Sequence, residues 1–420
     1  MPTMTFFVLL SLASLLTSCL SLALPTVGGN GKVGVVDISI PSNRHDDQYY
    51  VANLDFNGQT IPVLIDTASG DLFVGSNQCS TTNSTSGCYR SPVYQIDNQT
   101  TIIANETFGT VVGVAGVIGN QSIMPVDFGG VTVPDLATPL LFYAGQGEFQ
   151  NGSFGGIFGL APRNVSRNYY FFERLPPVEA MITKGLLEKP VMSLTLPRLG
   201  DPASPTTGKL TFGAIEDVAT IGDISYNDII DTPNYGYEDG RLSPQSWTSQ
   251  LLGVRMNGVE INLTRSSIDA EGRYLSLFDS GAQTILLRYQ EFTAVAALFH
   301  GPTIVQDGYA VFFDCSIPQL LELKYHGDDR WFAVDPLDLI IPSDHGVVNG
   351  TVMCKSALGT WSRTFADSIM GVPFMRNVLS VFDYKTEDLY SVQPRVGLGA
   401  LTDAKEAVGR YAEVYQNRLL

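Results

Sequence analysis

Two segments of this sequence end in an aspartate that follows an apolar, strand-like run. The first reads Val-Leu-Ile-Asp-Thr-Ala-Ser over residues 63–69, and the second reads Leu-Ser-Leu-Phe-Asp-Ser-Gly-Ala over residues 275–282. Burying a carboxylate at the end of an apolar strand is costly unless another group pairs with it or uses it. We therefore expect Asp66 and Asp279 to meet, to share one proton and to carry out acid–base chemistry.

The elements that would position these aspartates are mostly short β-strands. Apolar runs alternate with turn residues, and the chain contains 41 glycines and 23 prolines, which favours many strands joined by tight turns. The fold is therefore predicted to be mostly β with a few peripheral helices. Helical patterns occur at 178–187, 288–300 and 403–417. Strand-like runs occur at 32–40, 49–56, 60–65, 126–133, 191–197, 209–213 and 379–384.

A second pair of similar segments indicates an internal duplication. Gly-Ile-Phe-Gly-Leu at 156–160 and Ser-Ile-Met-Gly-Val at 368–372 each lie downstream of one aspartate. A chain of 420 residues is long enough for two lobes with separate cores. We expect one lobe over 49–200 and the other over 201–402, with one aspartate in each. Residues 403–420 would form a C-terminal helical extension, interpreted as a solvated amphipathic cap.

The charge balance narrows the range of partners. Acidic residues outnumber basic ones by 42 to 25, which gives a formal net charge of −17 at pH 7. Such a surface repels nucleic acid and anionic membranes, so neither is expected as a partner. It suits an acidic medium, where partial protonation limits self-repulsion. The four histidines are scattered without metal-ligand spacing, so no metal site is expected.

The N-terminal residues indicate entry into the secretory route. Residues 1–24 contain no charged side chain, and we interpret them as a secretory signal cleaved near Ala23 or Leu24, with an uncleaved membrane anchor as the alternative. Residues 25–48 would form a short pro-like segment and the first strand. No later segment is long and apolar enough to cross a bilayer, so stable membrane insertion is not expected after signal cleavage. The predicted location is extracellular, with an acidic vacuole as the alternative.

Cysteines and glycosylation acceptors support the same route. Of five cysteines, Cys19 lies in the expected signal, and local spacing among the other four favours disulfides Cys79–Cys88 and Cys315–Cys354 over the other two pairings. Candidate glycosylation sites with the Asn-x-Ser/Thr pattern are Asn83, Asn98, Asn105, Asn120, Asn151, Asn164, Asn262 and Asn349.

Taken in order, these motifs resemble those of the pepsin-like aspartic endopeptidases, in particular a secreted, fungal-type member. The resemblance runs from about Tyr49 to Thr402 and includes both aspartate segments, the Gly-rich segment at 155–161 and Trp247. The run from 369 to 383, followed by Val-Gly-Leu at 396–398, is similar to the closing signature of the family. The resemblance implies an all-β bilobal fold with lobes related by a pseudo-twofold axis. It also implies a monomer that needs no cofactor and binds extended polypeptide substrates in the interlobe cleft.

The implied activity is hydrolysis of peptide bonds at acid pH by the two aspartates. The charged carboxylate would take a proton from a water bound between them, and the protonated one would donate to the scissile carbonyl. By resemblance, Thr67 and Ser280 would lock the two loops together through hydroxyl-to-backbone hydrogen bonds. Small residues follow each aspartate because the amides of Ala68 and Gly281 must approach the carboxylates.

The two loops differ in one donor. Ser69 can donate a hydrogen bond to the outer oxygen of Asp66, whereas Ala282 offers Asp279 nothing comparable. Donors favour the ionised form of a carboxyl group. We therefore expect Asp66 to be the ionised member and Asp279 the protonated member of a pair that titrates jointly.

Three features depart from the family pattern. Ala68 stands where the family has a glycine, which is tolerated only at negative φ. The usual flap tyrosine and its tryptophan partner are absent. The best substitutes are Phe108-Gly109-Thr110, in a flap near residues 104–114 that would cover the substrate, and Phe73 at the tryptophan position. The usual basic propeptide is also missing from the short segment before Tyr49.

These departures leave two other functions open. The fold could persist in a catalytically weak or inactive binding or inhibitor protein, although the retention of both aspartates argues against it. A secreted β-sandwich that binds carbohydrate would require the paired aspartates to be a coincidence. For an active enzyme, the analogy with the family favours cleavage beside large hydrophobic side chains.

Overall fold

The computed structural model describes residues 31–41, 47–79, 88, 90–112, 115–145, 152–231, 246–325, 329–362 and 365–419. The expected signal at 1–24 lies outside the described residues, as do residues 25–30 and 42–46 of the expected pro-like segment. Within the described ranges, none of the helices has the length and apolar character needed to cross a membrane.

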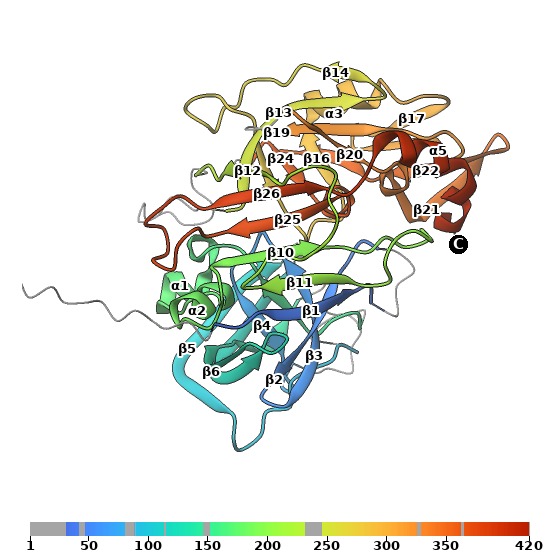
Figure 1. Cartoon of the computed structure of the whole chain (residues 1–420). Coiled ribbons are helices and arrows are strands. Elements are labelled where there is room, and N and C mark those ends of the chain that lie inside the picture. Colours follow the sequence, from blue (N-terminus) through green and yellow to red (C-terminus); the bar gives the residue numbers. More distant parts are fainter. Residues whose placement is uncertain are drawn as a thin grey trace, which may run out of the picture.

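The structure consists mainly of strands, as the sequence predicts (Figure 1). The strands of the first half are β1 (Gly34–Ser39), β2 (Val51–Phe56), β3 (Gln59–Asp66), β4 (Leu72–Gly75), β5 (Thr101–Val112), β6 (Ala115–Asp127), β7 (Thr132–Ala137), β8 (Leu140–Ala144), β9 (Gly156–Gly159), β10 (Val191–Thr195) and β11 (Gly208–Phe212). Those of the second half are β12 (Ser225–Asp228), β13 (Thr248–Met256), β14 (Val259–Ile261), β15 (Leu275–Phe278), β16 (Ile285–Arg288), β17 (Thr303–Gln306), β18 (Ala310–Asp314), β19 (Leu321–Tyr325), β20 (Trp331–Val334), β21 (Ile340–Val348), β22 (Thr351–Ser356), β23 (Leu358–Trp361), β24 (Ser368–Met370), β25 (Val378–Asp383) and β26 (Arg395–Ala400).

Helices are short and lie outside the sheets. The α-helices are α1 (Arg167–Phe172), α2 (Pro177–Thr183), α3 (Tyr289–Ala296), α4 (Val372–Met375) and α5 (Ala404–Val414). The 3₁₀ helices are η2 (Arg163–Val165), η3 (Pro336–Leu339) and η4 (Tyr415–Leu419).

One large sheet joins the two halves of the chain. It has 14 strands in the order β12-β26-β25-β10-β11-β1-β2-β3-β9-β4-β8-β6-β5, with β7 paired to β6. Strand β10 of the first half pairs antiparallel with β25 of the second, and both lie across the middle of Figure 1. An 8-stranded sheet, β20-β19-β13-β15-β24-β16-β23 with β14, and a 4-stranded sheet, β17-β18-β22-β21, complete the second half.

The duplication expected from the sequence is visible in the strand pairing. Strand β3 pairs parallel with β9, β9 antiparallel with β4, and β4 parallel with β8. In the second half β15 pairs parallel with β24, β24 antiparallel with β16, and β16 parallel with β23. The similar segments at 156–160 and 368–372 therefore occupy equivalent central positions, each beside the strand that leads to one aspartate.

One expectation about local structure was wrong. The run 126–133 is not one strand, because β6 ends at Asp127 and β7 begins at Thr132. Between them Gly129 and Gly130 adopt φ values of 67° and 98°, which glycine accepts readily and which a continuous strand does not allow.

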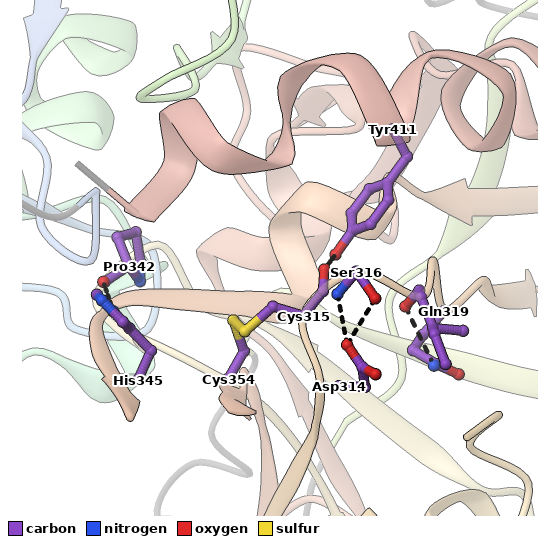
Figure 2. Close-up of a disulfide and its surroundings, with 9 residues drawn as sticks. Asp314, Cys315, Ser316, Gln319, Pro342, His345, Cys354 and Tyr411 are labelled. Carbon is purple, nitrogen blue, oxygen red and sulfur yellow. Dashed lines mark hydrogen bonds between the residues drawn. A yellow bond between two sulfur atoms is a disulfide. The ribbon is translucent and has the colours of Figure 1, made fainter. Parts of the chain in front are cut away.

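The C-terminal helix α5 is amphipathic, with one exposed face and one face packed on the rest of the protein. Tyr411 of α5 is fully buried, and its hydroxyl donates to the carbonyl oxygen of Cys315 at 2.7 Å (Figure 2). Arg410 donates to Asp201 Oδ1 at 2.7 Å and to Asp335 Oδ2. The helix is thus packed into the second half of the molecule and bonded to the segment that connects the two halves.

Candidate active site

The two aspartates lie at the ends of equivalent central strands. Asp66 is the last residue of β3, and its carbonyl accepts from the amide of Leu160 at 2.8 Å. Asp279 directly follows β15, and its amide donates to the carbonyl of Met370 at 3.1 Å. Each of the two strands lies inside its sheet and carries buried apolar side chains. Each aspartate is therefore attached to a rigid element.

Two buried hydroxyl groups join the aspartate loops reciprocally. Thr67 Oγ1 donates to the carbonyl of Phe278 at 2.8 Å and accepts from the amide of Ser280 at 2.9 Å. Ser280 Oγ donates to the carbonyl of Ile65 at 3.0 Å and accepts from the amide of Thr67 at 3.1 Å. Since both side chains are fully buried, these four bonds fix the loops against each other without competition from water.

The carboxyl groups lie side by side between the loops. Asp66 Oδ1 accepts from the amide of Ala68 at 2.9 Å, and Asp279 Oδ1 accepts from the amides of Gly281 at 2.8 Å and Ala282 at 3.1 Å. A Cβ atom on Gly281 would lie 3.0 Å from Cγ of Asp66 and 3.2 Å from Oδ1 of Asp279. Any larger residue at this position would press on both carboxyl groups and require them to shift by a few tenths of an ångström.

The environment of Asp279 favours its neutral form. Burial raises the pKa of Asp279 well above its ordinary value, and the neighbouring Asp66 carboxyl raises the pKa further. The amides of Gly281 and Ala282 oppose the rise. Asp66 instead receives a hydroxyl hydrogen bond on its outer oxygen, from Ser69 Oγ to Oδ2 at 2.7 Å. The pair is suited to hold one proton and to exchange it with a substrate.

A hairpin of β5 and β6 carries the aromatic residue expected in the flap. Phe108 of β5 is buried, and its ring centroid lies 5.5 Å from that of Phe73. Both rings belong to an apolar cluster that includes Leu141 and Ile157. Gly109 and Thr110 follow on the same strand and are half-buried. The hairpin base is therefore held by aromatic packing, while residues 113 and 114 lie outside the described residues.

The predicted disulfides are both formed, which confirms the pairing. Cys79–Cys88 and Cys315–Cys354 have Cα–Cα distances of 5.4 and 5.2 Å. The glycosylation sites stay a prediction. Of the candidate acceptors, Asn98, Asn105, Asn262 and Asn349 are exposed, Asn120 and Asn164 are half-buried, and Asn83 and Asn151 lie outside the described residues.

The sequence reasoning missed two contributors to this site. The sequence marks Trp247 only as a motif residue, but its buried indole donates from Nε1 to the carbonyl of Leu160 at 2.9 Å. The amide of Leu160 in turn donates to the carbonyl of Asp66. Asp71 is a buried carboxylate directly before the apolar strand β4, and its place beside an apolar run is the signal in the sequence that could identify it.

The site consists of two aspartate loops, one from each of two similar β-rich halves, joined by hydroxyl hydrogen bonds. This arrangement is typical of the bilobal aspartic peptidases. Comparison with known proteins places the chain in that class: the eukaryotic aspartyl protease family model matches residues 49–393. The chain belongs to this family and is an aspartic-type endopeptidase, a hydrolase of the pepsin-like group. Members of this group bind peptide substrates in a cleft between the two lobes.

Curated relatives cover most of the chain. A probable aspartic-type endopeptidase of Aspergillus fumigatus is 27% identical over 363 residues, which is 80% of this chain and 76% of the relative. Cathepsin D of Dictyostelium discoideum is 28% identical, covering 82% of each chain. Rhizopuspepsin-2 of Rhizopus niveus is 22% identical, covering 86% of this chain and 81% of the relative.

Proposed function

We propose that Asp66 and Asp279 are the catalytic pair and act on a water molecule bound between them. Ionised Asp66 removes a proton as the water oxygen attacks the scissile carbonyl carbon, and protonated Asp279 gives its proton to the carbonyl oxygen. When the C–N bond breaks, the amine nitrogen takes the proton held by Asp66. A hydroxyl of the intermediate returns a proton to Asp279. The observation that carries this proposal is the closeness of both carboxyls to one point: a Cβ atom on Gly281 would lie 3.0 Å from Cγ of Asp66 and 3.2 Å from Oδ1 of Asp279.

The substrate would lie extended beneath the β5–β6 hairpin, which we propose as the flap. Phe108-Gly109-Thr110 and Phe73 would shape the side of the cleft that receives it, and apolar residues beside the cleaved bond are favoured by analogy. A cavity of about 430 Å³ adjoins the second aspartate loop and is a candidate subsite. Its lining includes Gln283, Thr284, Leu286, Tyr309 and Leu358.

An active enzyme is favoured over an inactive binding protein by the geometry of Ala68. Ala68 is not among the described residues with positive φ, so its methyl group is accommodated without backbone strain. The side chain packs against the cluster formed by Leu277, Ala366 and Ile369. The residue therefore adds an apolar contact between the loops and leaves its amide bonded to Asp66.

We further propose that the enzyme is a secreted, glycosylated monomer. The chain would comprise a signal at 1–24, a pro-like segment at 25–48, lobes at 49–200 and 201–402, and an extension at 403–420. The fungal relatives and the disulfides support passage through an oxidising route. An acidic vacuole is the alternative destination, since a vacuolar aspartic protease of Candida albicans is 24% identical.

The test is cleavage of a denatured protein at acid pH by the purified enzyme. Asp66→Asn and Asp279→Asn should each lower the rate by about 100- to 10,000-fold, and a statine-containing peptide should block the wild type. Asp97→Asn, which changes an exposed carboxylate in a surface turn, is the matched control. Full activity in either dyad variant would disprove the assignment. A wild type that binds the statine peptide but cleaves nothing would favour the binding protein.

A further inference from the structure

Asp71 is a buried carboxylate that the proposed chemistry does not use. It directly precedes β4, shortly after the first aspartate loop, and is 6% exposed. It accepts hydrogen bonds from Ser166 Oγ at 2.6 Å and from the amides of Arg167 at 2.9 Å and Asn168 at 3.0 Å. Burial raises the pKa of Asp71, and these donors oppose the rise. The Asp71 carboxylate is therefore held inside the protein by three specific hydrogen bonds and is not a solvated surface charge.

The donors form the beginning of helix α1. Ser166 is the N-cap residue, and its hydroxyl oxygen also accepts from the amide of Tyr169 at 3.0 Å. Asp71 and Ser166 together satisfy amides that the first helical turn leaves free. Gly70 permits this approach, because a Cβ atom there would lie 2.9 Å from Cβ of Ser166 and 3.0 Å from its amide nitrogen. The aspartate loop is thus in direct contact with the start of α1.

The same helix and the segment that directly follows it are bonded to the two strands of the flap hairpin. Asn168 Oδ1 accepts from Nε2 of Gln121 on β6, and both side chains are buried. Arg174, just beyond the end of α1, donates to Oε1 of Glu106 on β5 at 3.2 Å. Helix α1 also packs against β5. Hydrogen bonds therefore connect Asp71 to the start of α1, and connect α1 and the residue beyond its end to the hairpin that carries Phe108.

We propose that Asp71 is a positioning residue that fixes the flap relative to the first aspartate loop through α1. The proposal rests on the proposed function, since it assumes that the hairpin closes over a peptide. Asp71 does not touch the reacting atoms. Its loss should release α1 from the loop, let the hairpin move independently and weaken substrate capture, while the hydroxyl lock of Thr67 and Ser280 keeps the two carboxyls together.

The test is Asp71→Asn in the whole processed enzyme. The concentration of active sites is measured by titration with a statine peptide. Asparagine has nearly the same shape but turns an N–H group toward donors, so at least one of the three hydrogen bonds is lost. We expect KM for a long peptide to rise about tenfold, with kcat per active site changed less than about twofold. Amide hydrogen exchange should become faster in 101–112 and 115–127.

A second variant protects the test against simple misfolding. Arg174→Met breaks only the half-buried pair with Glu106 and should change KM in the same direction by about two- to fivefold. Asp403→Asn, which alters the N-cap of the remote helix α5, should leave KM and exchange in the hairpin unchanged.

Unchanged KM and unchanged hairpin exchange in both test variants would overturn the proposal, as would a loss confined to kcat. Failure of the proposed function is distinguishable from this result. In that case the wild type cleaves nothing, whereas the exchange measurement still shows whether Asp71 couples the loop to the hairpin.

Discussion

Ser69 Oγ lies 2.7 Å from Oδ2 of Asp66, whereas no hydroxyl group of the described residues donates to Asp279. Ala282 occupies the matching place after the second aspartate, so only its amide reaches the carboxylate, at 3.1 Å to Oδ1. Since a donor stabilises the charged form, this difference acts in the same direction as the burial that raises the pKa of Asp279. Both effects support the proposed roles of Asp66 as the general base and Asp279 as the general acid.

Ala282→Ser should move the alkaline limb of the pH–activity profile to lower pH. A serine there can donate to the outer oxygen of Asp279, which stabilises the carboxylate and lowers the raised pKa of Asp279. The general acid then loses its proton at lower pH. A hydrogen bond worth about 1 kcal/mol corresponds to a shift of about one pH unit. The measurement is kcat/KM against pH, and a limb that stays in place would contradict the assignment.

Ser69→Ala should move the acid limb of the same profile to higher pH. The substitution removes the hydroxyl donor that stabilises the ionised member of the pair, so a higher pH is needed to keep one carboxyl charged. We expect a shift of about one unit or less, measured with the same substrate. An acid limb that moves with Ala282→Ser instead would reverse the roles of the two aspartates.

Ser280→Ala should destabilise the protein and lower its activity. The change leaves the carbonyl of Ile65 without its donor and the amide of Thr67 without its acceptor, in a fully buried place. Each unpaired buried group costs about 1–3 kcal/mol. Urea unfolding monitored by fluorescence measures the loss, and Thr67→Ser, which retains the hydroxyl, is the control. Equal stability of Ser280→Ala and the wild type would show that the lock contributes little.

Phe108→Tyr and Phe73→Trp should be coupled. Phe108 is buried in an apolar cluster, so a hydroxyl added there without a hydrogen-bond partner would cost about 1–3 kcal/mol. An indole at position 73 would supply a nitrogen donor beside it, since the two ring centroids already lie 5.5 Å apart. The double variant should therefore be more stable than the sum of the single changes predicts. Strict additivity in chemical unfolding would rule out a hydrogen bond between the new side chains.

Arg410→Ala should destabilise the enzyme more near neutral pH than at strongly acid pH. Arg410 bonds to Asp201 and Asp335, whose side chains are buried. Burial alone would raise the pKa of Asp201, but hydrogen bonds from Arg410 and Arg198 bring it below its ordinary value. A depressed carboxyl pKa gives stability that is present above the unfolded value, near 3.9, and is lost as pH falls through the folded value.

Removing one partner of a buried ion pair typically lowers the free energy of unfolding by about 3–5 kcal/mol. We expect a somewhat smaller loss for Arg410→Ala at pH 6, because Arg198 still contacts Asp201 at 2.7 Å. Thermal unfolding at pH 6 and pH 2 provides the comparison. Tyr411→Phe, which removes only the hydroxyl bonded to Cys315, is a smaller perturbation without a titrating group. An Arg410→Ala effect of the same size at both pH values would contradict the ion-pair account.

Much of the site could be predicted because its signals are local. An apolar run that ends in aspartate, a hydroxyl residue and small residues identifies both loops, and the spacing of cysteines identifies both disulfides. The sequence also indicates that the family's flap tyrosine and its tryptophan partner are both absent. In the structure Phe108 packs on Phe73 in their place. In contrast, Asp71 carries no distinctive local signal beyond its place before an apolar strand.

Contacts between distant segments could not be read from the sequence. Arg198 of the connecting segment makes two hydrogen bonds to the carboxylate of Asp338, at 2.9 and 2.7 Å, and Arg376 pairs with both Asp338 and Asp47. These charges are buried where the two halves meet. Along the chain each appears as an ordinary surface residue, because nothing near it in sequence shows that the fold will remove it from water.

The sequence by itself determined the two acidic loops, the β-rich class and the duplication, since strand periodicity, turn residues and small side chains act over a few neighbouring residues. Only the tertiary structure decided that Gly281 lies against both carboxyls, that Asp71 holds α1, and that α5 is bonded to the connection between the halves. Such contacts depend on which strands pair and in what order. Pairing is a cooperative property of the whole chain, because each long-range contact becomes favourable only when the others are formed.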